Sequence, residues 1–168
     1  MKPLHLFIVY LCNIFISCNS VKQQNTSSFS KETINTFLDN WHKAASEANF
    51  DNYFNAMDNI SVFVGTDASE VWSKKQFQDF SKPFFDKGKA WSFKKIQRNI
   101  YTENDTNFIW FDEILDTWMG VCRGSGVLKQ VNGKLVIKHY VLSVTVPNEV
   151  IDKVIPLKKE KEAKYLRH

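Results

Sequence analysis

The sequence predicts an α+β fold in which helices precede a run of antiparallel strands. Three observations predict it: helical periodicity from Ser30 onward, alternation of apolar and polar residues between Trp91 and Thr117, and an Asn132-Gly133 pair between two strand-like runs. Asn-Gly flanked by β-rich segments is the strongest short-range hairpin signal. Helices followed by consecutive strands are typical of an α+β domain. We therefore expect an α+β domain with N-terminal helices and a run of antiparallel strands.

The composition fits one globular domain with a substantial core. The chain has 168 residues, of which 43% are hydrophobic and 14% aromatic. Its formal net charge of +4 arises from Lys2 and from the segment 157–168, so the domain itself is balanced. A balanced domain lacks the basic surface of a nucleic-acid binder. We expect no nucleic-acid partner.

The first residues have the features of an export signal. A charged start is followed by a mostly apolar run from Leu4 to Ile16. This run is shorter than the roughly 20 residues of a membrane-spanning helix but matches the core of a signal peptide. We expect residues 1–18 to be a signal peptide and the polar residues 19–29 to be a flexible linker.

The end of that apolar run resembles a bacterial lipoprotein box. Phe15-Ile16-Ser17-Cys18 places a cysteine where the apolar run stops, with Phe15 where leucine is usual. The resemblance implies lipidation of Cys18, and several acyl chains anchor a protein more stably than one. We expect a cell-envelope protein held to a membrane through Cys18. The alternative is an ordinary cleaved signal peptide with a chance cysteine.

Cysteine usage indicates neither a disulfide nor a metal site. Cys122 alone remains in the expected domain, residues 30–151, and a single thiol cannot form an internal disulfide. No Cys/His spacing indicates zinc, so we expect no metal and no cofactor. Residues 152–168 form an expected charged C-terminal tail.

Two helices have clear start signals. Ser30 is expected to cap the first helix, whose apolar stripe has His42 as a neighbour, interpreted as a surface residue. Ser73 is expected to cap a third helix that Pro83 kinks or shortens.

Strict alternation predicts which residues share a face in the last strands. Trp110 and Asp112 share one face, and His139 and Tyr140 lie on opposite faces. We interpret the His139 face as a cavity wall and Asp112 as a candidate pocket carboxylate. Asp112 and Arg123 lie on successive strands, where an ion pair is the first interpretation and an anion-binding arginine the second.

Three separated motifs resemble the SnoaL-like domain of the nuclear transport factor 2-like superfamily. They are Gly65-Thr66-Asp67 with Glu70-Val71-Trp72, then Arg123-Gly124-Ser125-Gly126-Val127-Leu128, then His139-Tyr140-Val141-Leu142-Ser143 running into Val146-Pro147-Asn148-Glu149. The resemblance spans about residues 30–151 and implies a cone-shaped fold, with N-terminal helices packed on a curved, mainly antiparallel sheet. This superfold hosts isomerases, dehydratases, cyclases and plain binding domains, so it does not specify an activity.

Two departures from the family weigh against catalysis. Leu135 stands where the family usually has Trp, and Val141 stands where many relatives carry a second polar residue.

Dimerisation through the exposed sheet face is common in this superfamily. Phe111 and Tyr140 are the aromatic residues expected on that face, so the resemblance implies a homodimer.

Two classes of function follow. The favoured one is binding of a small apolar or amphipathic ligand, or a dimeric interaction module without catalysis. The alternative is a lyase or isomerase using His139 and Asp112 as general acid and base, which requires both to face one cavity. A role in the core or in an ion pair remains open for each candidate. The ligand-binding candidates are Trp72, Trp91, Trp110, Asp112, Arg123 and His139.

Overall fold

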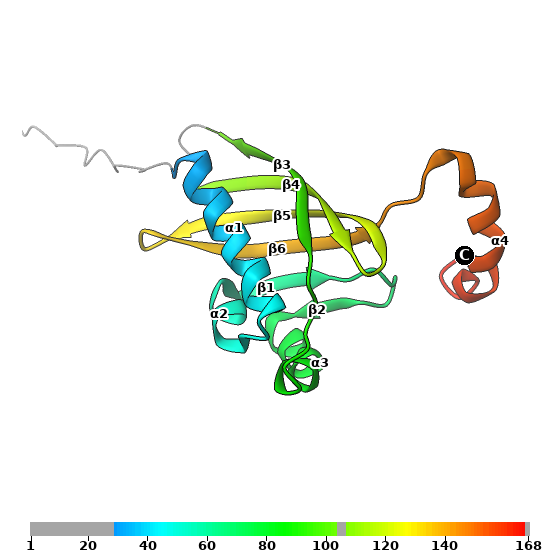
Figure 1. Ribbon diagram of the computed structural model, residues 1–168, viewed down its shortest axis with the longest axis horizontal. Coiled ribbons are helices and arrows are strands. Elements are labelled where there is room, and N and C mark those ends of the chain that lie inside the picture. Colours follow the sequence, from blue (N-terminus) through cyan, green and yellow to red (C-terminus); the bar gives the residue numbers. More distant parts are fainter. Residues whose placement is uncertain (1–28, 104–106, 167–168) are drawn as a thin grey trace, which may run out of the picture.

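The computed structural model describes residues 29–103 and 107–166 and shows the predicted α+β fold (Figure 1). Helix α1 (Lys31–Ser46) lies across one face of a six-stranded sheet. Helices α2 (Phe50–Asn55) and α3 (Lys74–Asp86) lie beside the edge formed by β1 and β2. The core fills the space between the helices and the inner face of the sheet.

The sheet has the order β2-β1-β6-β5-β4-β3. Only the β1–β6 pair is parallel among the described strands, and the other pairs are antiparallel. The strands are β1 (Met57–Val64), β2 (Val71–Ser73), β3 (Lys94–Thr102), β4 (Phe108–Thr117), β5 (Gly120–Val131) and β6 (Lys134–Val144).

Side-chain caps begin two of the helices as the sequence predicts. The Ser30 hydroxyl accepts a hydrogen bond from the Thr33 amide at 3.1 Å. Ser73 forms a capping box with Gln76, in which each side chain bonds the other residue's backbone amide. Pro83 lies inside α3, which ends soon after it.

The closing hairpin turns at the expected dipeptide. Asn132 and Gly133 both have positive φ, 49° and 76°, and Val131 pairs with Lys134 across the turn. Two successive positive φ angles define the type I′ turn, whose twist matches that of the flanking strands.

A β-bulge in β6 breaks the alternation that the sequence predicts. Val127 of β5 pairs with His139, but the next residue, Leu128, pairs with Ile137. Lys138 is therefore an extra residue without a partner on β5. One inserted residue moves every later side chain of a strand to the opposite face.

The bulge reverses the expected orientation of the second half of β6. Leu135 and Ile137 face the core before it, and Tyr140 and Leu142 face the core after it. His139 consequently lies on the outer face. The prediction that His139 shares a face with Ile137 is wrong because strict alternation ignores the inserted residue.

Strand β4 alternates without interruption. Ile109, Phe111, Glu113, Leu115 and Thr117 are all buried on the inner face. Trp110 and Asp112 lie on the outer face. Phe111 and Tyr140, expected on an exposed dimerisation face, are core residues instead.

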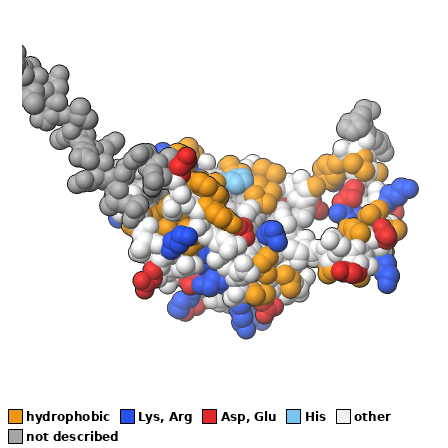
Figure 2. All heavy atoms as spheres, turned by 90° about the horizontal axis from the view of Figure 1, so that it is seen from above, with side chains coloured by type: hydrophobic (Ala, Val, Ile, Leu, Met, Phe, Trp, Pro, Cys, Tyr) orange, Lys and Arg blue, Asp and Glu red, His pale blue; other side chains and the backbone are white. Residues whose placement is uncertain are grey.

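The charged C-terminal segment is largely helical. A 3₁₀ turn (Asn148–Val150) leads into α4 (Ile151–Glu162), which stands apart from the sheet and has no buried residue (Figure 1). Figure 2 shows charged and apolar side chains mixed on this end of the molecule. None of the helices within the described ranges has the length and apolarity needed to cross a membrane.

Candidate functional site

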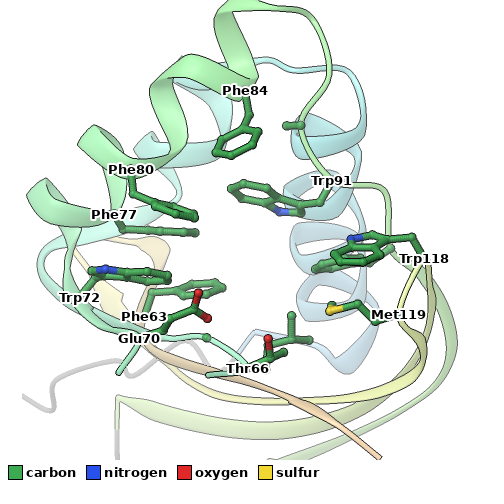
Figure 3. A pocket seen from close by; sticks show the side chains of 14 residues that line it. Phe63, Thr66, Glu70, Trp72, Phe77, Phe80, Phe84, Trp91, Trp118 and Met119 are labelled. Carbon is green, nitrogen blue, oxygen red and sulfur yellow. The ribbon is translucent and has the colours of Figure 1, made fainter. Parts of the chain in front are cut away.

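An open cavity of about 360 Å³ lies between α3, the segment before β3 and two loops at the end of the sheet (Figure 3). Its lining is almost entirely apolar and rich in aromatic rings. The lining residues are Phe63, Gly65, Thr66, Glu70, Trp72, Phe77, Phe80, Phe84, Ala90, Trp91, Phe93, Trp118, Met119 and Leu142.

Near-parallel rings form one side of the pocket. The ring centroids of Phe63 and Phe77 are 3.9 Å apart, and those of Trp72 and Phe80 are 4.7 Å apart. Trp91 stacks on Phe77 at 5.6 Å with 23° between the planes. Stacked rings hold one another in place at little further cost in side-chain entropy, so this side is preorganised.

Helix α3 places three of these rings through its periodicity. Phe77, Phe80 and Phe84 recur at spacings of three and four residues, which puts them on one face of a helix. Phe77 is buried, whereas Phe80 and Phe84 are 44% and 45% exposed. The helix therefore fixes its inner ring in the core and presents the outer two to the cavity.

The β4–β5 turn supplies the opposite side. Trp118 and Met119 point toward the cavity in Figure 3, and Trp118 is 82% exposed. The Thr117 hydroxyl holds this turn, because it donates to the Gly120 carbonyl at 2.8 Å and accepts from the Met119 amide at 3.0 Å. An exposed tryptophan on a braced turn is well placed to cover a bound ligand.

The β1–β2 loop supplies Thr66 and Glu70, the polar side chains of the lining. Backbone bonds close this loop, from the Gly65 amide to the Glu70 carbonyl at 2.8 Å and from the Glu70 amide to the Asp67 carbonyl at 2.9 Å. A Cβ atom at Gly65 would lie 2.2 Å from Glu70 Oε2. The glycine therefore allows the carboxylate to lie over the loop backbone.

Asp67 stabilises the same loop through its side chain, as aspartate commonly does in turns. Its Oδ1 accepts the Ser69 amide hydrogen bond at 2.8 Å, and the Ser69 hydroxyl bonds the same oxygen. These bonds, with a smaller effect of the Lys164 charge, hold the pKa of Asp67 below its usual value. Asp67 thus serves the loop and not the cavity.

A second polar centre is buried behind the pocket, around Glu113. This side chain is fully buried. Its Oε1 lies 2.8 Å from His42 Nε2 and accepts a hydrogen bond from the Tyr140 hydroxyl at 2.9 Å. Its Oε2 accepts from Arg98 Nε at 2.8 Å and lies 2.7 Å from Arg98 Nη2. Both carboxylate oxygens therefore have polar partners within the protein.

The partners of Glu113 determine its ionisation. Burial alone would raise the pKa of the Glu113 carboxyl, but hydrogen bonds and charge from His42 and Arg98 outweigh it and lower that pKa. Burial and the neighbouring Glu113 raise the pKa of the Tyr140 hydroxyl well above its ordinary value. The network therefore consists of an ionised carboxylate and a neutral phenol.

Rings separate this network from the cavity. Phe93 contacts His42 at a centroid distance of 6.3 Å, and Phe63 stacks on Tyr140 at 5.6 Å. Both phenylalanines also line the cavity. Glu113 itself is not among the lining residues, so its arrangement is that of an interior support for the pocket wall. His42, interpreted from the sequence as a surface residue, is 7% exposed and belongs to this support.

Two of the six ligand-binding candidates, Trp72 and Trp91, line the cavity. The other four lie on the outer face of the sheet. Among them, Trp110 stacks on Tyr101 with centroids 6.1 Å apart. Asp112 accepts hydrogen bonds from Asn99 Nδ2 at 3.1 Å and from the Tyr101 hydroxyl at 2.9 Å.

The outer face also holds Arg123 and His139. Arg123 lies opposite Ile114 and Ser143 and is exposed. Within residues 29–103 and 107–166, no ion pair joins it to Asp112, whose oxygens bond to β3 instead. His139 and Asp112 lie on strands that β5 separates, and neither lines the cavity. The acid–base interpretation therefore lacks the shared cavity that it requires.

Sequence reasoning missed several pocket residues. Trp118 lies in a turn, where no periodicity assigns it a direction. The spacing of Phe80 and Phe84 indicates a shared helix face but does not indicate a cavity beside it. In the part of the chain that the structure describes, no group of three or more His, Cys, Asp or Glu side chains could hold a metal ion.

Comparison with known proteins agrees with this architecture. The family model of the SnoaL-like domain matches residues 34–147. A comparison with curated protein sequences finds no match.

Solved structures share the fold at low sequence identity. An NTF2-like protein of unknown function from Pseudomonas putida aligns with a TM-score of 0.58 at 10% identity, over 71% of this chain and 89% of its own. An NTF2-like protein from Cytophaga hutchinsonii aligns with 0.56 at 13%, over 70% and 100%. The association domain of C. elegans CaMKII aligns with 0.56 at 16%, over 68% and 95%. At such identities the likeness establishes the fold alone.

Proposed function

The chain belongs to the SnoaL-like domain family, and we propose that it binds a small, mainly apolar ligand in the aromatic pocket. The observation that carries this proposal is the open cavity of about 360 Å³ with ordered rings on its walls. Small-molecule sites have volumes of roughly 300–1,000 Å³ and are lined mainly by apolar and aromatic side chains. The cavity lies within this range.

Burial of apolar surface supplies the driving force for such binding. Each 100 Å² of apolar ligand surface removed from water contributes about 2.5 kcal/mol before the entropy of immobilisation is subtracted. Because ring stacking and the Thr117 hydrogen bonds already order the walls, little side-chain entropy is lost on binding.

A pair of tryptophan substitutions tests the pocket. Trp118→Ala removes an exposed pocket ring, and Trp110→Ala removes an exposed ring from the outer face. Native mass spectrometry of protein purified from its own host should show a bound small molecule in the parent and in Trp110→Ala. That signal should weaken strongly in Trp118→Ala. Equal ligand retention by the two variants, or no ligand with the parent together with no binding of a hydrophobic fluorescent probe, contradicts the proposal.

We propose self-association through the outer sheet face as a second function. No helix among the described elements packs on this face, and Tyr101 and Trp110 are 42% and 44% exposed there. Stacked exposed aromatics are typical of protein interfaces. One structural neighbour is by name an association domain, which is compatible with assembly.

Light scattering tests self-association. The parent should elute with the mass of a homodimer, and Trp110→Lys should shift it toward the monomer. Trp118→Lys, a matched change outside this face, should leave the mass unchanged. A parent that is monomeric at high concentration excludes this interface.

We also propose that the protein is exported and anchored through Cys18. Residues 1–28 lie outside the described residues, so support for this proposal comes from the sequence alone. Cys18→Ala should move the protein from the membrane fraction to the soluble fraction of its host. A variant that stays with the membrane excludes lipidation at this residue.

A further inference from the structure

We propose that the ligand of the aromatic pocket is an organic cation, with an alkylated ammonium group that pairs with Glu70 between the rings. This inference rests on the ligand-binding function proposed above and specifies the ligand's charge. Two independent properties of the lining carry it: the isolation of the Glu70 carboxylate and the arrangement of aromatic faces around it.

Glu70 is the one charged residue among those that line the cavity, all of which the structure describes. Its Oε2 accepts a hydrogen bond from the Asp67 amide at 3.2 Å. Within the described ranges, no lysine, arginine or histidine forms an ion pair with it. A carboxylate covered by an apolar ligand without a counter-charge would lose hydration at a substantial free-energy cost. A cationic ligand supplies that counter-charge.

Aromatic faces surround the same space. In Figure 3 the Glu70 carboxylate lies beside Phe63, and the rings of Trp72, Trp91 and Trp118 lie around the same cavity. A cation over the face of an aromatic ring is attracted by the ring's negative potential, and tryptophan is the strongest partner. Several rings with one carboxylate form the type of cage that recognises quaternary ammonium groups.

The charges near the pocket disfavour the opposite ligand class. A fatty acid or phosphate ester needs a basic side chain or a set of free amides, and no basic side chain lines this cavity. The nearby positive charge of Lys164 acts on Asp67, whose Oδ1 is already bonded to Ser69. Glu70 would repel an anion placed among the rings. The lining therefore selects against anionic amphiphiles.

Three probes of similar shape distinguish the effect of ligand charge on affinity from the effect of ligand shape. Phenyltrimethylammonium is the cation, tert-butylbenzene is its neutral isostere, and 4-tert-butylbenzoate is the related anion. Binding to the full domain is measured by quenching of tryptophan fluorescence and by calorimetry. The cation should bind about tenfold more tightly than the neutral isostere, and the anion should bind most weakly.

Glu70→Gln tests the carboxylate directly. The amide keeps the shape of the side chain and an oxygen for the Asp67 amide. This variant should bind the cation about tenfold more weakly and the neutral isostere as before. Asp79→Asn, which removes an exposed carboxylate from an ion pair with Lys75 on α3, is the matched control and should change neither affinity.

If Glu70→Gln does not fold, a salt titration of the unmodified protein tests the role of the carboxylate instead. Affinity for the cation should fall with ionic strength, and affinity for the neutral isostere should not. Equal affinities for cation and isostere, or a cation affinity unchanged in a folded Glu70→Gln, overturn the cation inference. The proposal that the pocket binds an apolar ligand is not affected by either result. Failure of all three probes and of a hydrophobic fluorescent probe overturns the binding function itself.

Discussion

Gly124 faces Tyr140 across the inner surface of the sheet so closely that a Cβ atom at Gly124 would lie 2.2 Å from the Tyr140 hydroxyl oxygen. The same Cβ would lie 3.0 Å from Glu113 Cγ. The absence of a side chain at Gly124 is therefore what lets the tyrosine reach the buried carboxylate. Gly126 plays a similar part, because its Cβ would lie 2.6 Å from the His139 carbonyl oxygen and 2.9 Å from the Phe111 ring.

Gly124→Ala should destabilise the domain by about 1–3 kcal/mol, the usual cost of overpacking a core. The methyl group would displace the Tyr140 hydroxyl from Glu113. Urea unfolding measures the loss. A double-mutant cycle with Tyr140→Phe supplies the control, since part of the alanine's cost requires the hydroxyl. Strict additivity of the two substitutions would show that the contact is unimportant.

Glu113→Ala should lower the free energy of unfolding by about 3–5 kcal/mol, because it leaves the buried Nε and Nη2 of Arg98 without an acceptor, while Nη1 keeps its ion pair with Asp39. Denaturant unfolding followed by circular dichroism measures the change. Asp86→Asn removes the exposed carboxylate of the ion pair with Lys82 and should cost less than about 1 kcal/mol. Similar losses in the two variants would contradict a supporting role for the buried network.

Stability should fall in acid because of Glu113. The native state holds the pKa of this carboxyl below the ordinary value of 4.5, so the unfolded chain binds a proton more readily. The contribution of Glu113 to stability is therefore fully present above that ordinary value. It is lost as the pH falls through the lowered native pKa. Urea midpoints from about pH 7 down to about pH 3 should show a shallower decline in Glu113→Gln. Parallel pH profiles for parent and variant would refute this assignment.

Deletion of Lys138 should prevent folding or destabilise the domain severely. Without the extra residue, strict alternation would move either Tyr140 and Leu142 or Leu135 and Ile137 out of the core. Lys138→Ala keeps the bulge and removes only the partly exposed ion pair with Asp58, so it should cost about 1 kcal/mol or less. Soluble yield and thermal melting compare the two. A deletion variant as stable as Lys138→Ala would mean that the strand can shift its register without penalty.

Local signals were sufficient to predict the order of the helices and strands. Ser30 and Ser73 cap helices in the structure, and Asn132-Gly133 forms the hairpin turn, because each acts through bonds to near neighbours. The predicted α+β order and the SnoaL-like resemblance are confirmed. These features depend on residue type and spacing, which a sequence displays directly.

The site was predicted only in part, because tertiary contacts decide which face of a strand points to the core. Alternation in β4 separates Trp110 from Phe111, yet both faces carry large apolar side chains, so the pattern does not say which one is the core. In β6 the extra residue at Lys138 gives no signal in the sequence pattern. It exchanges the faces of the sheet on which His139 and Tyr140 lie. The position of His42 in the network depends on Glu113, which is 71 residues away in the chain.

Because β4 alternates without interruption, its successive residues lie on two different surfaces of the sheet. Phe111 belongs to the interior, and Trp110 belongs to the outer face proposed for docking of a second copy. The turn that follows, held by hydrogen bonds of the Thr117 hydroxyl, places Trp118 at the pocket proposed to bind a ligand. Substitutions in the proposed ligand pocket can therefore leave the proposed docking face unchanged, and the reverse, because Trp118 and Trp110 lie on different surfaces.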